Sequence, residues 1–288
     1  MKKLITIFNI KNIEKFYPYV DGFIIGNNDF SSRLTTSFSI DEINEIIDKS
    51  INNNKEIFLN VNQMFTDQQL KQFVQIFKQI NYQKLTGIIC ADLGTIVELQ
   101  KLKLNNKLVY NPETLLTNQI DFNFLSSEIK GAFVAKEITI DDVLLIGKNK
   151  QMELFFLGHG HLNMFYSKRK LLNNYQELTN NELDFNFKQN LKIIEPNKRK
   201  NTPYPIYQDL AGTHVFRSKV MNSFQYLDQL EKVVDYFVID TIFKNDDYGL
   251  EIAKLYFNKN NENIEEIQTR YNESWDNGFL DKKTYYKR

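Results

Sequence analysis

The chain has 288 residues, of which 42% are hydrophobic and 14% aromatic, which is enough for one large barrel domain or two ordinary domains. Lysine plus arginine and aspartate plus glutamate each number 36, so the formal net charge is zero and any contact with nucleic acid must be local. Cys90 is the single cysteine, which excludes a disulfide framework, a four-thiolate zinc site and an iron–sulfur cluster held by this chain's own thiolates.

The first residues carry a charged start and a short apolar run that Thr6 and Asn9 interrupt. This run is too short for the apolar region of a signal peptide. No other stretch reaches the roughly 18 uncharged residues that a membrane helix needs. We therefore expect a cytoplasmic protein that does not contact a membrane.

Short apolar runs rich in β-forming residues follow one another along the chain, and each is as long as a typical strand. Segments with helical spacing lie between most of them, and Ser39 and Thr66 precede two of these segments as typical N-cap residues. The predicted strands are residues 4–8, 22–26, 56–61, 86–90, 107–110, 131–135, 153–157 and 236–240. Strands that alternate with helices predict a parallel sheet with right-handed crossovers, and eight of them are the number that closes a (β/α)8 barrel.

The predicted fold is therefore an α/β, TIM-barrel-like parallel barrel with a loop-rich insertion before its last strand. Residues 1–172 hold the first seven strands and their helices, residues 173–234 form the insertion, and residues 235–288 hold the last strand, a closing helix and a polar tail. The insertion is polar, rich in asparagine and lysine, and contains three of the five prolines. This composition is typical of loops rather than of an independent core.

A parallel barrel places its functional residues at the carboxyl ends of its strands and in the loops that follow. That rule selects Asn9, Asn27, Arg33, Asn60, Asn62, Asp92, Asn111, Glu113, Lys136, Glu137, His159 and Asp240. Polar residues are also common at strand ends for structural reasons alone, so the set indicates a site better than any single member does.

Asn111 precedes Pro112 directly after the fifth predicted strand, which favours an extended Asn111 and a rigid turn that carries Glu113. A carboxylate positioned in this way could bind a substrate hydroxyl or act as a base. The same spacing also fits an Asn-Pro turn in which Glu113 caps the next helix. We predict catalytic roles for Glu113, His159 and Asp240.

His159 and His161 are separated by one residue, and side chains at this spacing in an extended chain point the same way. With Asp240 or Glu113 they could form a metal site, which is the basis of an alternative prediction, a metal-dependent hydrolase or peptidase. A hydrogen-bonded pair at the barrel rim explains the same pattern without metal.

A basic cluster, Lys168–Lys170, is flanked by Phe165, Tyr166 and Tyr175. Cations interleaved with aromatic residues suit RNA phosphates and stacked bases, so we predict that Lys168, Arg169, Lys170 and Tyr175 bind RNA. The solvated start of a helix would look the same. The sequence contains no nucleophile elbow, His-Glu-x-x-His helix, phosphate-binding glycine-rich loop or Cys-x-x-Cys pair.

The segment of residues 153–175 resembles the signature region of peptidase family U32, in the branch that hydroxylates tRNA in firmicutes and mollicutes. The resemblance is carried by residues 153–175, Phe30 with Arg33-Leu34, Asn111–Thr114 with Thr117-Asn118, Tyr204–Ile206 with Asp209 and Gly212–His214, Ile239-Asp240 with Lys244, and Gly278–Leu280 with Lys283-Thr284. It implies a barrel protein, named historically for a collagenase-like peptidase activity, whose relatives hydroxylate the wobble uridine of tRNA without oxygen. It also implies prephenate as a co-substrate and substrate-binding roles for Arg33, Asn111, Asn118, Lys136, Glu137 and His214.

The chain departs from this family where several members hold an iron–sulfur cluster on four cysteines. Asn163 stands at the place of the first signature cysteine, and no cysteine follows it. An amide is a poor ligand for a soft metal, so we expect this chain alone to bind no such cofactor. We therefore predict that it binds tRNA as the partner of a cysteine-bearing U32 paralogue, in a hetero-oligomer. A barrel mouth that works without a cluster, and a non-catalytic RNA-binding module, remain as alternatives.

Overall fold

The computed structural model of the chain describes residues 1–180, 192–194 and 203–281. Eight parallel strands follow one another in the order β11, β1, β2, β3, β4, β5, β6 and β7, and β7 pairs with β11 to close the ring. These strands are β1 (Lys2–Thr6), β2 (Gly22–Ile25), β3 (Glu56–Val61), β4 (Gly87–Cys90), β5 (Leu108–Tyr110), β6 (Gly131–Phe133), β7 (Glu153–Ser167) and β11 (Tyr236–Ile239). The predicted parallel barrel is confirmed, and except at the end of β7 the predicted bounds differ from the observed ones by at most two residues.

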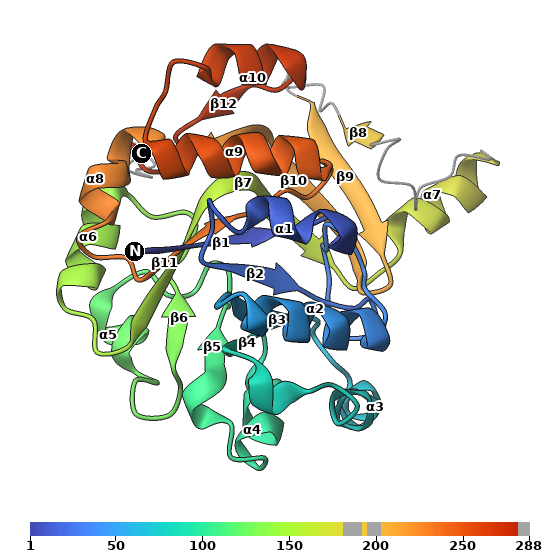
Figure 1. Ribbon diagram of the computed structural model, residues 1–288. Helices are drawn as coiled ribbons and strands as arrows, with labels where there is room; N and C mark the ends of the chain where they lie inside the picture. The colour runs from blue at the N-terminus through green and yellow to red at the C-terminus, as the bar shows by residue number, and fades with distance from the viewer. Residues whose placement is uncertain (181–191, 195–202, 282–288) are drawn as a thin grey trace, which may run out of the picture.

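Helices connect the strands around the outside of the ring (Figure 1). They are α1 (Ile13–Phe16), α2 (Ile40–Asn52), α3 (Asp67–Phe77), α4 (Leu93–Gln100), α5 (Gln119–Asn123), α6 (Ile140–Lys148), α7 (Leu171–Thr179), α8 (Leu227–Leu230), α9 (Asp246–Asn258) and α10 (Ile264–Arg270). Ser39 and Thr66 cap α2 and α3, as predicted, and each forms a reciprocal capping box with the residue three positions later. These caps satisfy amide groups that the first helical turn leaves without partners.

The barrel has two apolar layers because strand residues alternate between its inside and its outside. The inner layer fills the ring and consists of Leu4, Ile24, Phe58, Ile89, Val109, Phe133, Phe155, Tyr236 and Val238. The outer layer packs the strands against the surrounding helices. Side chains therefore fill the lower part of the barrel, and space for a ligand remains only at the carboxyl ends of the strands.

Strand β7 is the largest departure from the prediction. It was expected to end at residue 157, but it continues to Ser167 because β10 (Gly212–Asn222) pairs with its second half in antiparallel fashion. The polar segment that contains His159 and His161 is thus part of a strand and not of a loop.

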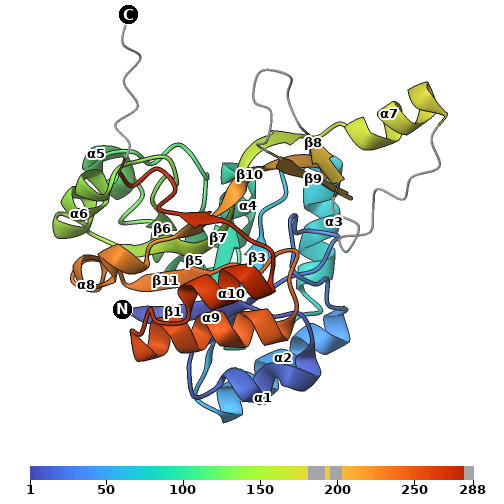
Figure 2. The ribbon, with the colours of Figure 1, turned by 90° about the horizontal axis from the view of Figure 1, so that it is seen from above.

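The insertion also contains more regular structure than its composition indicated. Its described part holds β8 (Lys192–Ile194), β9 (Tyr204–Asp209), β10 and α8, and β9 and β10 form an antiparallel hairpin that extends the sheet beyond the barrel. A short strand, β12 (Trp275–Asp276), pairs with β10. Figure 2 shows this extension and α7 projecting from one side of the barrel, while α9 and α10 lie next to each other on another side.

None of the helices in the described ranges is long and apolar enough to cross a membrane.

Candidate active site at the barrel mouth

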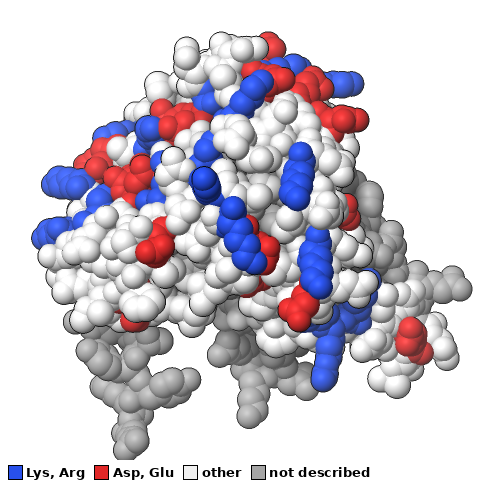
Figure 3. Space-filling model, turned by 90° about the horizontal axis from the view of Figure 1, so that it is seen from below, with Lys and Arg blue, Asp and Glu red and all other residues white. Residues whose placement is uncertain are grey.

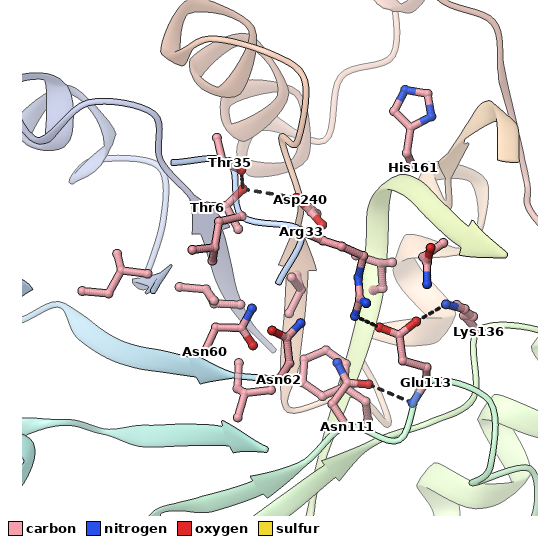
Figure 4. Close-up of a pocket in the computed structure, with 18 of the residues that line it drawn as sticks. Thr6, Arg33, Thr35, Asn60, Asn62, Asn111, Glu113, Lys136, His161 and Asp240 are labelled. Atoms are coloured by element: carbon pink, nitrogen blue, oxygen red, sulfur yellow. Dashed lines mark hydrogen bonds and ion pairs between the residues drawn. The ribbon is translucent and has the colours of Figure 1, made fainter. Parts of the chain in front are cut away.

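A cavity of about 920 Å³ opens at the carboxyl ends of the barrel strands (Figure 4). Residues that follow β1, β2, β3, β5, β6 and β11 line it, together with part of β7. Its polar lining consists of Thr6, Arg33, Thr35, Thr36, Asn60, Asn62, Asn111, Glu113, Lys136, His161, Asn163 and Asp240. We call this space the inner cavity.

Glu113 is the centre of an ion-pair cluster in the inner cavity. One carboxylate oxygen accepts a hydrogen bond from the Arg33 guanidinium, and the other accepts one from the Lys136 ammonium. Figure 4 shows the three side chains converging from different loops at the mouth. The Arg33 and Lys136 side chains are almost fully buried, whereas the Glu113 side chain keeps about a quarter of its surface, 26%, in contact with solvent.

The backbone at this cluster is held in an uncommon conformation. Glu113 and Arg33 have φ angles of 66° and 55°, in the left-handed region that residues other than glycine seldom adopt. The Asn111 side chain accepts a hydrogen bond of 3.2 Å from the Glu113 amide and so stabilises the turn that Pro112 introduces. Such conformations cluster at functional sites, because surrounding contacts must compensate for the strain.

The two cations determine the protonation of Glu113. Burial alone would raise the pKa of its carboxyl group, but the charges of Arg33 and Lys136 outweigh burial and lower the pKa to about 2. Burial lowers the pKa of the Lys136 ammonium. At neutral pH Glu113 is therefore an ionised carboxylate between two cations, which makes it a hydrogen-bond acceptor and an anchor rather than a strong base.

Asp240 also lines the inner cavity and belongs to a hydroxyl network. Its carboxylate accepts a 3.0 Å hydrogen bond from the Ile242 amide and a longer one, 3.5 Å, from the Thr6 hydroxyl. Thr35 donates in turn to Thr6 over 2.8 Å. Asp240 and Glu113, both predicted from the sequence, thus share one cavity.

Asp209 of β9 positions the loop that carries Arg33. Its Oδ2 accepts a 2.8 Å hydrogen bond from the Arg33 backbone amide, while Oδ1 accepts from the Nε2 of His214 at 3.0 Å and from the Ala211 amide. His214 is fully buried and stacks against the ring of Tyr166. His214, predicted to bind substrate, therefore does not line the inner cavity, and its imidazole contacts Asp209 and Tyr166 instead.

The His159 side chain is separated from Glu113 and Asp240, the two carboxylates predicted to be catalytic, whereas His161 lines the same cavity as they do. His159 is fully buried outside the inner cavity, and its Nε2 donates over 2.7 Å to the hydroxyl of Tyr248, which itself donates to Glu273. His161 lines the cavity, but Figure 4 shows its imidazole pointing away from Arg33 and Asp240. The imidazole Nδ1 of His161 lies 3.2 Å from the Arg217 carbonyl oxygen.

In the part of the chain that the structure describes, His159 and His161 lack the further ligands that a metal site would need. Over the described residues, no three histidine, cysteine, aspartate or glutamate side chains are grouped so that they could hold a metal ion. Within the described ranges, the structure therefore does not bring His159 and His161 together with Glu113 or Asp240 as a set of metal ligands. The reason is that His159 packs against Trp275 and Tyr248 instead of facing the cavity.

Two further predicted residues lie outside the cavity. Asn118 is exposed and caps α5, where its side-chain oxygen accepts from the amides of Ile120 and Asp121. Glu137 is exposed next to Lys136 and does not line the inner cavity.

The predicted RNA-binding residues form an exposed surface beside the mouth. Lys168, Arg169 and Lys170 are exposed at the end of β7, and Tyr175 on α7 is half exposed. The Lys168 ammonium donates to the Met64 carbonyl over 2.9 Å, so this lysine also ties β7 to the loop before α3. Figure 3 shows Lys and Arg side chains gathering between α3 and α7, whereas acidic and basic groups are mixed over the rest of that face.

The thiolate ligands of a four-cysteine cluster are missing. Asn163, which the resemblance to the family aligns with the first signature cysteine, lines the inner cavity. Cys90 is fully buried in the apolar core, where burial raises the pKa of its thiol. The residues present therefore do not fit an iron–sulfur cluster.

Sequence reasoning missed several parts of this site. Thr6 and Thr35 lie in the hydroxyl network, and Asp209 fixes Arg33 although it is 176 residues away in the chain. The match of Asp209 to the family pattern was the only available signal for it. Thr6 lies inside an apolar run, so hydropathy alone could not distinguish it from a structural threonine.

Comparisons with known proteins identify the family of the chain. The sequence model of peptidase family U32 matches residues 11–285. The tRNA hydroxylation protein P2 of Bacillus subtilis (strain 168) is 25% identical over 289 residues, which cover 92% of each chain. An uncharacterized protease of Methanocaldococcus jannaschii is also 25% identical, over 84% of this chain and 63% of its own.

Among solved structures, a U32 peptidase superposes with a TM-score of 0.50 and 10% identity, over 84% of this chain and 92% of its own. This likeness concerns the fold. Because the family model spans nearly the whole chain, the protein belongs to peptidase family U32.

Proposed function

We propose that this chain takes part in the hydroxylation of the wobble uridine of tRNA, with its barrel mouth as the substrate site. The observation that carries this proposal is the Arg33–Glu113–Lys136 cluster in a cavity that lies next to the exposed basic segment Lys168–Lys170. Its relation to the tRNA hydroxylation protein of Bacillus subtilis, over 92% of both chains, supports tRNA as the partner.

The inner cavity suits a small anionic co-substrate, and we propose prephenate. Two cations and several amide groups line the cavity close to one another, and a carboxylate bound there would replace part of the pairing that Glu113 now supplies. Apolar side chains such as Ile24, Phe133 and Val238 form its floor and could contact a ring. The site has the mixed character of small-molecule pockets, which are mostly apolar with a few fixed polar groups.

The redox chemistry is assigned to a second protein. Asn163 and the buried Cys90 cannot replace the thiolates of a cluster. We therefore propose that a cysteine-bearing U32 paralogue joins this chain in a hetero-oligomer in the cytoplasm, where tRNA is modified. The metal-dependent hydrolase is not proposed, because its ligand set is incomplete.

The basic segment provides a test of tRNA binding. Replacing Lys168, Arg169 and Lys170 together with alanine is expected to weaken binding and to reduce the slope of log affinity against log salt by about one unit per lost phosphate contact. Electrophoretic mobility shifts at several salt concentrations measure this slope. Because the chain has no net charge, a diffuse basic surface cannot replace the lost contacts.

Replacing the exposed residues Lys101 and Lys103 serves as the control, and the slope should not change, because they lie between the end of α4 and the start of β5, at the end of the barrel away from the mouth. Equal slopes for the parent and the triple variant would remove the RNA assignment from this segment.

A further inference from the structure

A second cavity adjoins the first on its outer side. Its volume is about 750 Å³, and the two cavities share six lining residues: Arg33, Asn62, Asn111, Glu113, Lys136 and Asn163. The ion-pair cluster around Glu113 therefore lies at the boundary between an inner and an outer space. We call the second space the outer cavity.

Exposed apolar side chains form the outer wall of the outer cavity. Met64 is 53% exposed, Met164 43% and Phe165 48%, and all three line it. Met164 and Phe165 belong to the part of β7 that extends beyond the barrel, and Lys168 ties the Met64 backbone to the same strand end. Two flexible thioethers and an aromatic ring around a cavity offer flat or adaptable surfaces on which a planar group can stack.

Hydrogen-bond donors line the inner end of the outer cavity. The Asn62 side-chain oxygen already accepts from the Ser32 amide at 2.7 Å, and the Asn111 oxygen accepts from the Glu113 amide. Figure 4 shows the Asn111 oxygen turned toward Glu113. Because the side-chain oxygens of Asn62 and Asn111 already accept hydrogen bonds, their NH₂ groups are the atoms that can donate to a ligand. Lys136 and Arg33 add further donors at the same end.

The donors at the inner end of the outer cavity determine which kind of planar group can bind there. A ring edge with carbonyl oxygens finds partners there, whereas an edge with an exocyclic amine would place donors against donors. At ring position 4 uracil carries a carbonyl and cytosine carries an amine, although both bases present two acceptors and one donor along the pairing edge. Donors that face position 4 thus fit uracil better than cytosine.

We propose that the outer cavity receives one uracil base of tRNA, turned out of its stack. The base lies against Phe165, Met164 and Met64, and its carbonyl edge faces the amides of Asn62 and Asn111 next to the Glu113 cluster. The phosphates on either side of the base then face Lys168–Lys170, which directly follow β7, the strand that carries Tyr166 of the cavity wall. This inference rests on the proposed function, because tRNA is taken from it.

The test uses the purified chain and three RNA hairpins that correspond to an anticodon stem and loop. They carry uridine, cytidine or an abasic ribose at the wobble position and are otherwise identical. Removing the base is expected to weaken binding about 5-fold to 150-fold, the range that corresponds to the loss of one stacked base. Cytidine is expected to bind more weakly than uridine.

The variant Phe165→Ala is expected to reduce the difference between the uridine and abasic hairpins while leaving the salt slope unchanged, because stacking does not release counterions. Phe124→Ala is the matched control, because Phe124, the residue that follows α5, is 82% exposed and does not line either cavity. This control should bind all three hairpins as the parent does. Circular dichroism of both variants shows whether they fold.

Equal affinity of the parent for the uridine and abasic hairpins would overturn the base site while leaving tRNA binding, and hence the proposed function, intact. Equal affinity for uridine and cytidine would overturn the orientation toward Asn62 and Asn111. If no hairpin and no tRNA binds, the proposed function fails and the base site fails with it. The comparison of hairpins on the parent protein requires no variant, so misfolding of Phe165→Ala cannot prevent a decision.

Discussion

Glu113 shows how a single side chain can be both a structural anchor and a functional group. Its carboxylate pairs with Arg33 and Lys136, and these charges hold its pKa near 2 against the opposing effect of burial. A ligand that competes for either cation would free part of this carboxylate next to the bound molecule. Ligand binding in the inner cavity would therefore change the position of the Glu113 carboxylate.

Replacing Glu113 with glutamine is expected to lower the free energy of unfolding at neutral pH by about 1–3 kcal/mol, because Arg33 and Lys136 lose their charged partner. The pKa of Glu113 is lower in the folded chain than its ordinary value of 4.5, so its contribution is fully present above about pH 4.5 and is lost as the pH falls toward about 2. The difference in stability between the parent and Glu113→Gln should thus shrink on acidification. Urea unfolding at a series of pH values measures it, and a difference that is constant with pH would contradict the ion-pair assignment.

His159 provides a second pH test at the residue scale. Burial lowers the pKa of its imidazole to about 4, so the folded chain holds it neutral while the unfolded chain binds a proton below about 6.5. This contribution is present above about pH 6.5 and is lost as the pH falls toward about 4. The variant His159→Phe should therefore lose less stability over this range than the parent does. Parallel stability curves for the two proteins would show that His159 is not held neutral.

Single residues also show how far the sequence could predict the site. Of the residues at the predicted strand ends, Arg33, Asn60, Asn62, Asn111, Glu113, Lys136 and Asp240 line the inner cavity. Asn9 and Asp92 do not, because their side chains accept hydrogen bonds from backbone amides and cap the following helices. Asn27 uses its side chain in the same way within its own loop. A cap and a ligand-binding group have the same residue type and the same place in the sequence, and only the structure distinguishes them.

At the scale of elements, the hairpin β9–β10 extends strand β7 beyond the barrel. By pairing with residues beyond the barrel, β10 converts a predicted loop into a continuous strand that carries Met164 and Phe165 and ends just before the basic segment. The hairpin also supplies Asp209, which holds the Arg33 loop. Local patterns could not predict this pairing, because its two strands are far apart in the chain and its composition is polar.

The variant Asp209→Asn tests whether the hairpin positions Arg33. Asparagine can keep the bonds that Oδ1 accepts within the β9–β10 turn, but it places an NH₂ group against the Arg33 amide, where Oδ2 now accepts. Loss of this acceptor is expected to lower the free energy of unfolding by about 1–3 kcal/mol and to reduce tRNA modification in cells. Asp228→Asn on α8 is the control, because the Asp228 side chain is exposed and makes only a long contact with Lys259. Unchanged stability and modification with Asp209→Asn would show that Arg33 needs no support from the hairpin.

At the scale of the whole molecule, the barrel was predictable because each of its eight strands is a short buried run between helical segments. Closure by β7 and β11 follows from that number. The placement of His159 was not predictable in the same way. A one-residue irregularity in the pairing of β7 with β11, between Val238 and Ile239, accompanies its position outside the cavity, and alternation along the sequence does not reveal such a shift.

The proposed function makes Glu113 at the barrel mouth necessary for tRNA hydroxylation. The most direct test is mass spectrometry of tRNA nucleosides from cells that lack the gene and carry either the parent chain, Glu113→Gln or the control Glu137→Gln. Glu137 is an exposed neighbour of Lys136 outside the inner cavity, so its variant changes the same charge at a different place. The parent and Glu137→Gln should restore hydroxylated wobble uridine, and Glu113→Gln should not restore it although it still binds tRNA. Full restoration by Glu113→Gln, or unchanged hydroxylation in cells without the gene, would contradict the account.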